Sequence, residues 1–290
     1  MSFGPADASA MDREFAFTKA DFEKVKTLIY RHAGIALGDS KQNMVYSRLA
    51  RRLRANKLTR FSDYLQVIEG DKGEELQTFV NSLTTNLTSF FREQHHFPIL
   101  AGLLRNLAAR AEIRIWCAAA STGEEPYSIA ITALEALGPK ASRVRITASD
   151  IDTNVIATAQ AGSYPEESLR KMDEATARRY FHRGGREPEG RARVKQELQS
   201  MVEFRRLNLL DATWPLKQPF DAIFCRNVMI YFDRPTQRKV LEKFLPLLLP
   251  HGRLFVGHSE NLGYARDLFH LEGHTVYRPL HGGPKLHAPK

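Results

Sequence analysis

The chain has 290 residues, of which 43% are hydrophobic and 26% are charged, a balance typical of globular proteins. No stretch approaches about eighteen uninterrupted apolar residues, and the N-terminus lacks a basic start with a long apolar core, so we expect neither membrane insertion nor a secretory signal. The formal net charge of +9 predicts an acidic partner, and nucleic acid, anionic lipid and an acidic protein surface all meet that requirement.

The N-terminal part of the chain is predicted to be helical throughout. Apolar residues recur at helical spacing over residues 15–83, without convincing strand alternation, so we expect an all-helical domain over residues 14–85. The segment TTNLTSFFRE, residues 84–93, breaks this pattern with five Thr, Ser or Asn residues, and residues 95–110 return to helical spacing. Residues 86–110 are therefore predicted to be a linker followed by a helix.

One predicted helix of this domain, residues 41–60, is strongly basic and contains no Asp or Glu. Val45, Leu49 and Leu53 form the apolar stripe of a half-buried helix, which leaves several arginines off that stripe. The basic residues form either a solvated face or a docking face for an acidic protein helix. They are Lys41, Arg48, Arg51, Arg52, Arg54, Lys57 and Arg60.

After Ala111 short apolar runs alternate with helical stretches. This alternation predicts an α/β fold with a doubly wound, mostly parallel sheet over residues 111–282, and such sheets bind ligands beyond the carboxyl ends of their strands. The predicted strands are residues 113–118, 144–149, 202–207, 220–225, 253–257 and 275–277, and the predicted helices are residues 126–136, 153–161 and 234–249.

The interval between the helix ending near Ala161 and the strand at Val202 is about forty residues long, where a short loop is usual. We expect residues 162–203 to form an inserted subdomain. Tyr180, Phe181 and Val194 are its core candidates, and they flank a turn-rich stretch at residues 183–190. That pattern fits a hairpin with an exposed edge, which can pair with an extended peptide.

The first strand of the sheet runs into CAAASTGEEPYSIA, residues 117–130. Ser121 and Thr122 each precede a glutamate by three residues, which predicts two overlapping capping boxes at the start of a helix. The dinucleotide fingerprint is absent, and Glu124 and Glu125 at this helix start would repel phosphates. A cofactor with a positive charge and no phosphate, such as S-adenosylmethionine, suits these carboxylates; alternatively, both only cap the helix.

Polar side chains follow the other predicted strands. Asp150 is our candidate for hydrogen bonds to ribose hydroxyls, whereas Asp152 could cap the next helix instead. Taken singly, Asn208 fits a turn, Arg226 a surface ion pair and Tyr231 a half-buried aromatic. Their convergence on one sheet edge favours a binding site. The polar residues at this edge are Asp150, Asp152, Asn208, Arg226, Asn227 and Tyr231.

The remaining reactive side chains have structural interpretations. Cys117 and Cys225 lie in apolar runs without metal-ligand spacing, so we expect free thiols in a cytoplasmic protein and no metal. His258 follows the fifth predicted strand, and we expect it to make a structural hydrogen bond.

Five stretches together resemble the CheR-type chemotaxis receptor glutamate methyltransferases, and the resemblance runs over about residues 15–280. It implies a class I S-adenosylmethionine-dependent methyltransferase domain, an all-helical N-terminal receptor-docking domain and a small inserted β-subdomain. The segment AAASTGEE replaces the glycine-rich loop of other methyltransferases but matches the CheR pattern. The stretches are LTTNLTSFFRE (83–93), STGEEPYSIA (121–130), SDID (149–152), FDAIFCRNVMIYF (220–232) and LFVGHSENL (254–262).

The resemblance also implies an activity, namely methyl transfer from S-adenosylmethionine to receptor glutamates with S-adenosylhomocysteine as the product. Its partners would be the cytoplasmic helices of methyl-accepting receptors and, in some members, a receptor C-terminal peptide held by the subdomain at residues 162–203. A monomer is expected, with no nucleic acid partner. Arg92 and Tyr231 become candidates for the transfer step. The implied cofactor-binding residues are Asn86, Thr88, Arg92, Glu125, Asp150, Asn208, Leu209, Arg226 and Asn227.

Two rival functions follow from the same fold and charge. An RNA or DNA methyltransferase acting on base nitrogens often carries an Asn/Asp-Pro-Pro-aromatic loop after the fourth strand, but the chain has RNVMIY there, without proline. A degenerate, non-enzymatic scaffold is the second rival. The acidic, Asn and Arg residues present at the strand ends argue against it.

Overall fold

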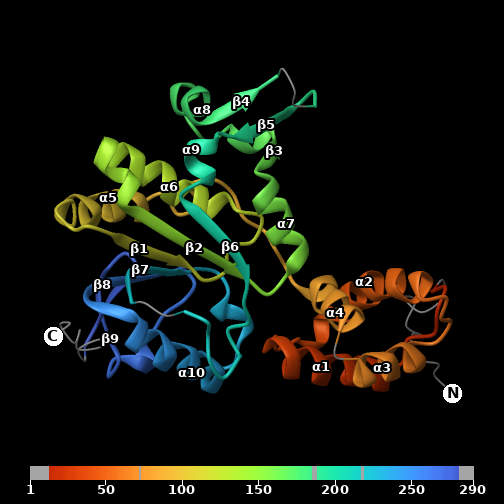
Figure 1. The fold of residues 1–290 in the computed structure, drawn as a ribbon. Helices are drawn as coiled ribbons and strands as arrows, with labels where there is room; N and C mark the ends of the chain where they lie inside the picture. The colour runs from red at the N-terminus through yellow and green to blue at the C-terminus, as the bar shows by residue number, and fades with distance from the viewer. Residues whose placement is uncertain (1–12, 72, 185–187, 217–218, 281–290) are drawn as a thin grey trace, which may run out of the picture. The chain divides into compact units, whose positions relative to one another are not determined.

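The computed structural model describes residues 13–71, 73–184, 188–216 and 219–280 (Figure 1). The chain divides into two compact units, one ending at Thr84 and the other beginning at Thr85. We call them the N-terminal and the C-terminal unit. No helix in the described residues has the length and apolarity needed to cross a bilayer.

The described residues of the N-terminal unit form four α-helices and one 3-10 turn. Thr18 caps α1 through a capping box: its side chain accepts the Asp21 N–H, and the Asp21 carboxylate accepts the Thr18 N–H. Gly34 ends this helix in the left-handed conformation, with φ at 69°. The elements are α1 (Lys19–Ala33), η1 (Asp39–Lys41), α2 (Gln42–Ala55), α3 (Phe61–Gly70) and α4 (Glu74–Leu83).

The apolar stripes predicted from spacing form the core of this unit. Val45, Leu49 and Leu53 of α2 are fully buried, as are Leu28 of α1 and Phe79 of α4. Burial of such side chains contributes about 1.5–3 kcal/mol each, so the packed stripes account for the helical arrangement better than local propensity does.

The C-terminal unit contains a seven-stranded sheet with the strand order β6-β2-β1-β7-β8-β10-β9. All neighbouring pairs from β6 to β8 are parallel, and β10 is antiparallel to both of its neighbours. This order confirms the predicted doubly wound, mostly parallel sheet. The strands are β1 (Ile113–Cys117), β2 (Val144–Asp150), β6 (Val202–Arg206), β7 (Phe220–Cys225), β8 (Leu248–Val256), β9 (Phe269–Gly273) and β10 (Val276–Pro279).

Helices cover both faces of the sheet (Figure 1). Along β1, Ile115 and Cys117 pack into a core with α5 and α6, whereas Trp116 points to the opposite face and packs with Phe244 of α10. This alternation is the two-residue period of a strand buried on both sides. The helical elements are α5 (His96–Asn106), α6 (Glu124–Leu137), η2 (Gly138–Arg143), α7 (Thr153–Ala161), η4 (Met229–Tyr231), α10 (Arg234–Phe244), η5 (Leu245–Leu247) and η6 (Gly263–Ala265).

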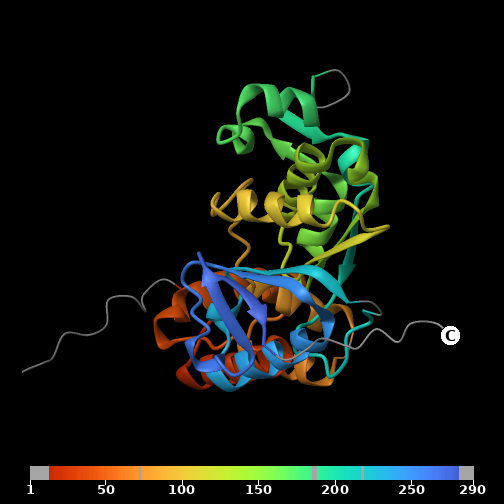
Figure 2. The same ribbon diagram turned by 90° about the vertical axis from the view of Figure 1, so that its left-hand side faces the viewer.

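The long interval after α7 forms a second sheet of three antiparallel strands in the order β3-β5-β4. It lies beyond α6, on the side of the unit away from α10 (Figures 1 and 2). Tyr180, Phe181 and Val194 are buried in it, as expected, while residues 185–187 of the turn-rich stretch lie outside the described residues. Its elements are β3 (Ser163–Pro165), η3 (Glu166–Leu169), α8 (Glu174–Tyr180), β4 (Phe181–Arg183), β5 (Arg191–Val194) and α9 (Gln196–Gln199).

Several sequence-based boundaries were wrong, and one strand was missed: the helix predicted over residues 41–60 ends at Ala55, and the strand predicted over residues 253–257 begins at Leu248. The helix predicted over residues 234–249 ends at Phe244, and β8 already begins at Leu248. Pro246 explains the early end, since proline has no N–H to continue an α-helix and it opens the 3-10 turn η5 instead. Strand β9 was missed, although its first four residues, FHLE, alternate between apolar and polar side chains as a half-buried strand does.

Candidate functional site

The order of strands reverses between β1 and β7, so the connections that follow these strands diverge. In open parallel sheets this switch point leaves a crevice at the carboxyl ends of the strands. The segments after β1, β2, β6, β7 and β8 all begin at that edge, and they hold most of the predicted site residues.

The turn between β1 and α6 has a conformation that the sequence did not reveal. Gly123, with φ at 100°, is the N-cap of α6, and no side chain caps this helix. A Cβ atom on Gly123 would lie 2.6 Å from the Tyr164 hydroxyl oxygen and 2.8 Å from the Ala159 Cβ, so only glycine fits. The predicted capping boxes are therefore wrong. Instead, the Ser121 hydroxyl donates to the Asn86 carbonyl (3.0 Å), and the Thr122 hydroxyl donates to the Glu124 carboxylate (2.6 Å).

Asp150, at the end of β2, is buried and accepts backbone hydrogen bonds. Its carboxylate accepts the Ser121 N–H at 2.8 Å and the Asp152 N–H at 3.0 Å. Burial raises the pKa of Asp150 to about 6. Asp152 has the alternative role anticipated for it: it caps α7 and accepts a 2.8 Å hydrogen bond from the Asn86 amide.

Arg226, directly after β7, is the buried cation of the site, with only 1% of its side chain exposed. Its Nη1 lies 2.9 Å from the Glu125 Oε2, its Nε lies 3.7 Å from the Glu93 Oε2, and its Nη2 donates to the Arg92 carbonyl oxygen. The interpretation of Arg226 as a surface residue is therefore wrong. Burial raises the pKa of Glu125, although the Arg226 charge opposes that rise.

Glu93 was not singled out from the sequence, although it ends the TTNLTSFFRE motif. Its backbone is left-handed, with φ at 54°, and only 8% of its side chain is exposed. Its Oε1 accepts hydrogen bonds from the His258 N–H (3.1 Å) and the Asn227 amide (3.3 Å), and the His258 Nδ1 lies 2.9 Å away, the hydrogen bond expected for this histidine. Burial opposes the ionisation of Glu93, but these hydrogen bonds and the charge of Arg226 hold its pKa below the usual value.

Glu260 is a second carboxylate that sequence reasoning missed. It is buried and accepts three backbone hydrogen bonds, from Asn227 (2.8 Å), Met229 (2.7 Å) and Gly257 (2.6 Å). Asn227 is left-handed, with φ at 58°. Glu260 therefore ties the turn after β7 to the turn after β8, and its place in the LFVGHSENL stretch was the available signal.

Contacts join the predicted residues into two groups. One contains Asn86 and Asp150, which share Ser121 as a partner, and the other contains Arg92, Glu125, Arg226 and Asn227.

The remaining predicted site residues belong to neither of these two contact groups. The Asn208 side chain accepts the Leu210 N–H (3.0 Å), as in the turn interpretation, and Leu209 is buried. Thr88 is half-buried, and Tyr231 is half-buried against the core on the α10 face.

The chain matches two protein families over most of its length. The family described as CheR methyltransferase, SAM binding domain, matches residues 86–278, and the family described as CheR methyltransferase, all-alpha domain, matches residues 20–84. The chain belongs to the CheR methyltransferase family. Its sequence resemblance, its methyltransferase activity with S-adenosylmethionine and its fold class are thereby confirmed.

Named relatives agree with the CheR assignment. Chemotaxis protein methyltransferase 2 of Pseudomonas aeruginosa is 53% identical over 269 residues, which cover 92% of this chain and 96% of that protein. The chemotaxis protein methyltransferase of Escherichia coli is 51% identical over 268 residues, covering 92% of this chain and 93% of that protein. A more distant relative with the same name, from Borreliella burgdorferi, is 34% identical over 264 residues, covering 88% of this chain and 92% of that protein.

The side chains at the strand ends of this CheR methyltransferase are chemically suited to binding S-adenosylmethionine. The site combines buried carboxylates with one buried guanidinium, and it contains no phosphate-binding glycine pattern. A carboxylate such as Asp150 can accept hydrogen bonds from ribose hydroxyls, and acidic groups favour a ligand with sulfonium and ammonium charges.

Proposed function

We propose that this CheR methyltransferase transfers the methyl group of S-adenosylmethionine to glutamate side chains on the cytoplasmic helices of chemotaxis receptors, giving methyl esters and S-adenosylhomocysteine. The observation that carries the proposal is the pair of contact groups at the strand ends, one with buried Asp150 and the other with buried Arg226 paired to Glu125, in a chain about half identical to chemotaxis protein methyltransferases. Methyl transfer to purified receptor cytoplasmic fragments, with RNA as a control acceptor, tests it. Base-labile label on the receptor alone is the expected result.

The proposed reaction needs little acid–base chemistry from the protein. S-adenosylmethionine supplies a methyl carbon activated by its sulfonium. A glutamate carboxylate with an ordinary pKa near ~4.3 is already ionised at neutral pH, so no general base is required. The residues of the chain have to orient the two reactants and exclude water, which can lower a barrier by roughly 7–11 kcal/mol.

We assign the cofactor-binding roles to the residues named above. Asp150 would accept the ribose hydroxyls, and Glu125, held by Arg226, would face the ammonium group. Tyr231 would line the transfer channel. The remaining proposed contacts come from Asn86, Thr88, Arg92, Asn208, Leu209 and Asn227.

Arg92 is expected to act in transfer geometry rather than in folding. Its backbone carbonyl accepts from Arg226, but its half-exposed side chain makes only one described hydrogen bond, to the Leu87 carbonyl (2.8 Å). An Arg92→Ala variant should therefore keep its melting temperature and lose most of its methylation activity. Arg105→Ala, which removes an exposed arginine of α5, should change neither property. An active Arg92 variant, or one that unfolds, would contradict this role.

The proposed docking face on α2 is narrower than the sequence indicated. Arg52 forms two hydrogen bonds with Glu75 (3.0 and 2.6 Å), and Arg48 donates to the Thr84 carbonyl (2.7 Å). Arg54 likewise pairs with Glu14. These arginines have partners inside the N-terminal unit, whereas Arg51 is exposed and makes no ion pair within the described residues.

Reversing the charge of Arg51 should slow receptor methylation at low salt without changing the affinity for S-adenosylmethionine. The defect should shrink as the ionic strength rises, because the Debye length falls from about 30 Å at 0.01 M to about 10 Å at 0.1 M. Arg31→Glu is the matched control, since it makes the same charge change at an exposed site on α1. Equal slowing by both variants would mean that only net charge matters.

The inserted sheet is the proposed tether for a receptor tail. Within the described residues, its outer strands β3 and β4 each pair with β5 alone, so each has an edge that an extended peptide could join. A flexible tail held there would raise the local enzyme concentration near many methylation sites without adding catalytic contacts.

Replacing residues 184–190 with a short Gly/Ser turn should abolish the advantage of tailed over tailless receptors. Arg183 is kept because it pairs with Glu174 (2.9 Å) inside the subdomain. Tailless receptor fragments are the matched control substrate, and their methylation and the affinity for S-adenosylmethionine should stay unchanged. If the variant binds a tail peptide as tightly as the parent does, the tether assignment is wrong.

A further inference from the structure

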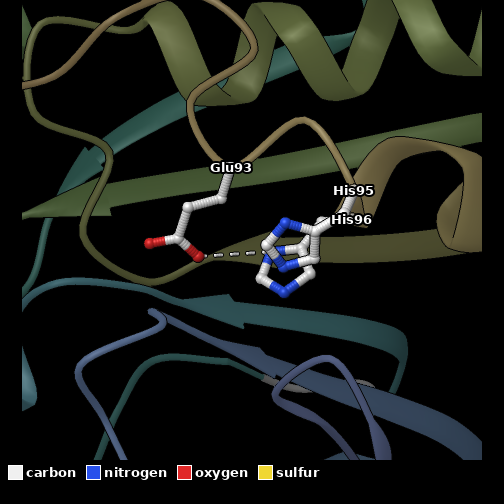
Figure 3. A group of neighbouring side chains, drawn as sticks. All are labelled: Glu93, His95 and His96. Carbon is white, nitrogen blue, oxygen red and sulfur yellow. Dashed lines mark ion pairs between the residues drawn. The ribbon is translucent and has the colours of Figure 1, made fainter.

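Three candidate metal ligands gather at the start of α5: Glu93, His95 and His96 (Figure 3). One ligand atom from each of them lies within 4.8 Å of the others. His96 is fully buried and Glu93 nearly so, whereas His95 is exposed. The group is therefore buried on the side of Glu93 and His96 and open to solvent on the side of His95.

Two polar atoms of this group face each other without a hydrogen bond. The Glu93 Oε2 and the His96 Nδ1 are 3.7 Å apart, and neither has a hydrogen-bond partner among the described residues. Buried polar atoms are rarely left in this state, because each costs about 1–3 kcal/mol. The unsatisfied pair needs an explanation that the cofactor site does not provide.

The tautomer of His96 follows from its other nitrogen. The Nε2 lies 2.8 Å from the His274 carbonyl oxygen, which can only accept, so the ring proton is on Nε2. The Nδ1 then offers a lone pair to a carboxylate oxygen that also only accepts.

We infer that Glu93, His95 and His96 bind a divalent cation of the zinc class. Imidazole nitrogens and a carboxylate oxygen are typical zinc ligands, and three of them leave one position open on the His95 side. The hydrogen bond from the His96 Nε2 to a backbone carbonyl is the outer contact that usually orients a metal-binding histidine. A cation would satisfy both of these acceptors, neither of which has a hydrogen-bond partner among the described residues, at once.

Binding at this site would reach the cofactor-binding network through Glu93. The Arg226 Nε lies 3.7 Å from the same Oε2, so the cation would compete with Arg226 for that carboxylate. It would also add positive charge beside the groups proposed to hold S-adenosylmethionine. Because S-adenosylmethionine carries a sulfonium charge that S-adenosylhomocysteine lacks, zinc should weaken its binding more than it weakens that of the product. This consequence rests on the proposed cofactor site.

The site can be tested by titrating Zn²⁺, against a chromogenic chelator, into the full chain after treatment with EDTA. The parent should bind one ion tightly. His95→Ala should bind it at least about tenfold more weakly, since losing even an outer contact of a metal site costs about that much. His182→Ala, which removes an exposed histidine of β4, should bind zinc like the parent. Both variants should bind S-adenosylmethionine normally without zinc.

Calorimetry with and without Zn²⁺ then tests the coupling. We expect zinc to lower the affinity of the parent for S-adenosylmethionine more than for S-adenosylhomocysteine, and His95→Ala to abolish the difference. Equal zinc affinity in the parent and in His95→Ala would overturn the site, and a bound ion with no differential effect would overturn the coupling. Neither result would bear on the proposed methyltransferase activity, because methyl transfer is measured without zinc.

Discussion

An Arg226→Met variant is expected to lose about 3–5 kcal/mol of its free energy of unfolding, the typical effect of removing one partner from a buried ion pair. Methionine keeps much of the side-chain volume, so a cavity contributes little. The loss arises because Glu125 and Glu93 remain buried while their common cation disappears. Urea denaturation of the ligand-free chain measures it. Arg206→Met, at an exposed arginine of β6, should stay within about 0.5 kcal/mol of the parent.

The pH dependence and a double-mutant cycle distinguish charge from packing. Without Arg226 the folded-state pKa of Glu125 should rise further, so the folded chain binds this proton more readily than the unfolded chain does. Stability then falls as the pH rises, and the defect should be smaller at pH 5 than at pH 7.5. Adding Glu125→Gln should recover part of the loss. Strictly additive effects of the two substitutions would argue against the ion pair.

The fold could be predicted from the sequence because its signals are local and repeated. The stripe of Val45, Leu49 and Leu53 identifies a helix, and the strand over residues 220–225 was predicted with the bounds of β7, since fully buried apolar runs have few alternatives. The prediction failed where a single residue determines how the local backbone folds. Pro246 ended a helix whose apolar pattern continued, and the left-handed Gly123 displaced the caps expected at Ser121 and Thr122.

The candidate site was predictable only in part, for a different reason. Asp150 and Arg226 follow strands directly, so the parallel sheet brings them to one edge whatever the loops do. Glu93 and Glu260 act through contacts between segments more than 100 and about 30 residues apart, such as Glu93 with Asn227 and Glu260 with Met229. No pattern within either segment encodes that pairing. The pairing of the α2 arginines could not be predicted for the same reason. Arg52 and Arg54 form ion pairs with Glu75 and Glu14, which lie in other parts of the N-terminal unit.

An Asp150→Ala variant should bind S-adenosylmethionine about 1.5–3 kcal/mol more weakly, the usual range for lost hydrogen bonds to a charged group. This corresponds to roughly ten- to hundredfold in Kd. The carboxylate already accepts the Ser121 and Asp152 N–H groups, and its remaining lone pairs are the ones proposed to accept the ribose hydroxyls. Asp173→Asn is the matched control, because it removes an exposed charge while asparagine still caps α8. Unchanged affinity in a folded Asp150→Ala variant would remove this residue from the site.

The affinity should also depend on pH, with opposite signs for binding and for stability. With a folded-state pKa of about 6, Asp150 is ionised at pH 7.5 but only about one tenth ionised at pH 5, so the Kd of the parent should rise about tenfold over that range. The same raised pKa means that the folded chain takes up the proton before the unfolded chain does. This residue therefore makes the ligand-free protein more stable as the pH falls from 7.5 to 5, while cofactor binding weakens. Calorimetry and urea denaturation at the two pH values measure both trends, and Asp150→Asn should flatten the contribution of this residue to each. A parent whose Kd does not change between pH 7.5 and pH 5 would contradict the proposal that the ionised carboxylate holds the ribose.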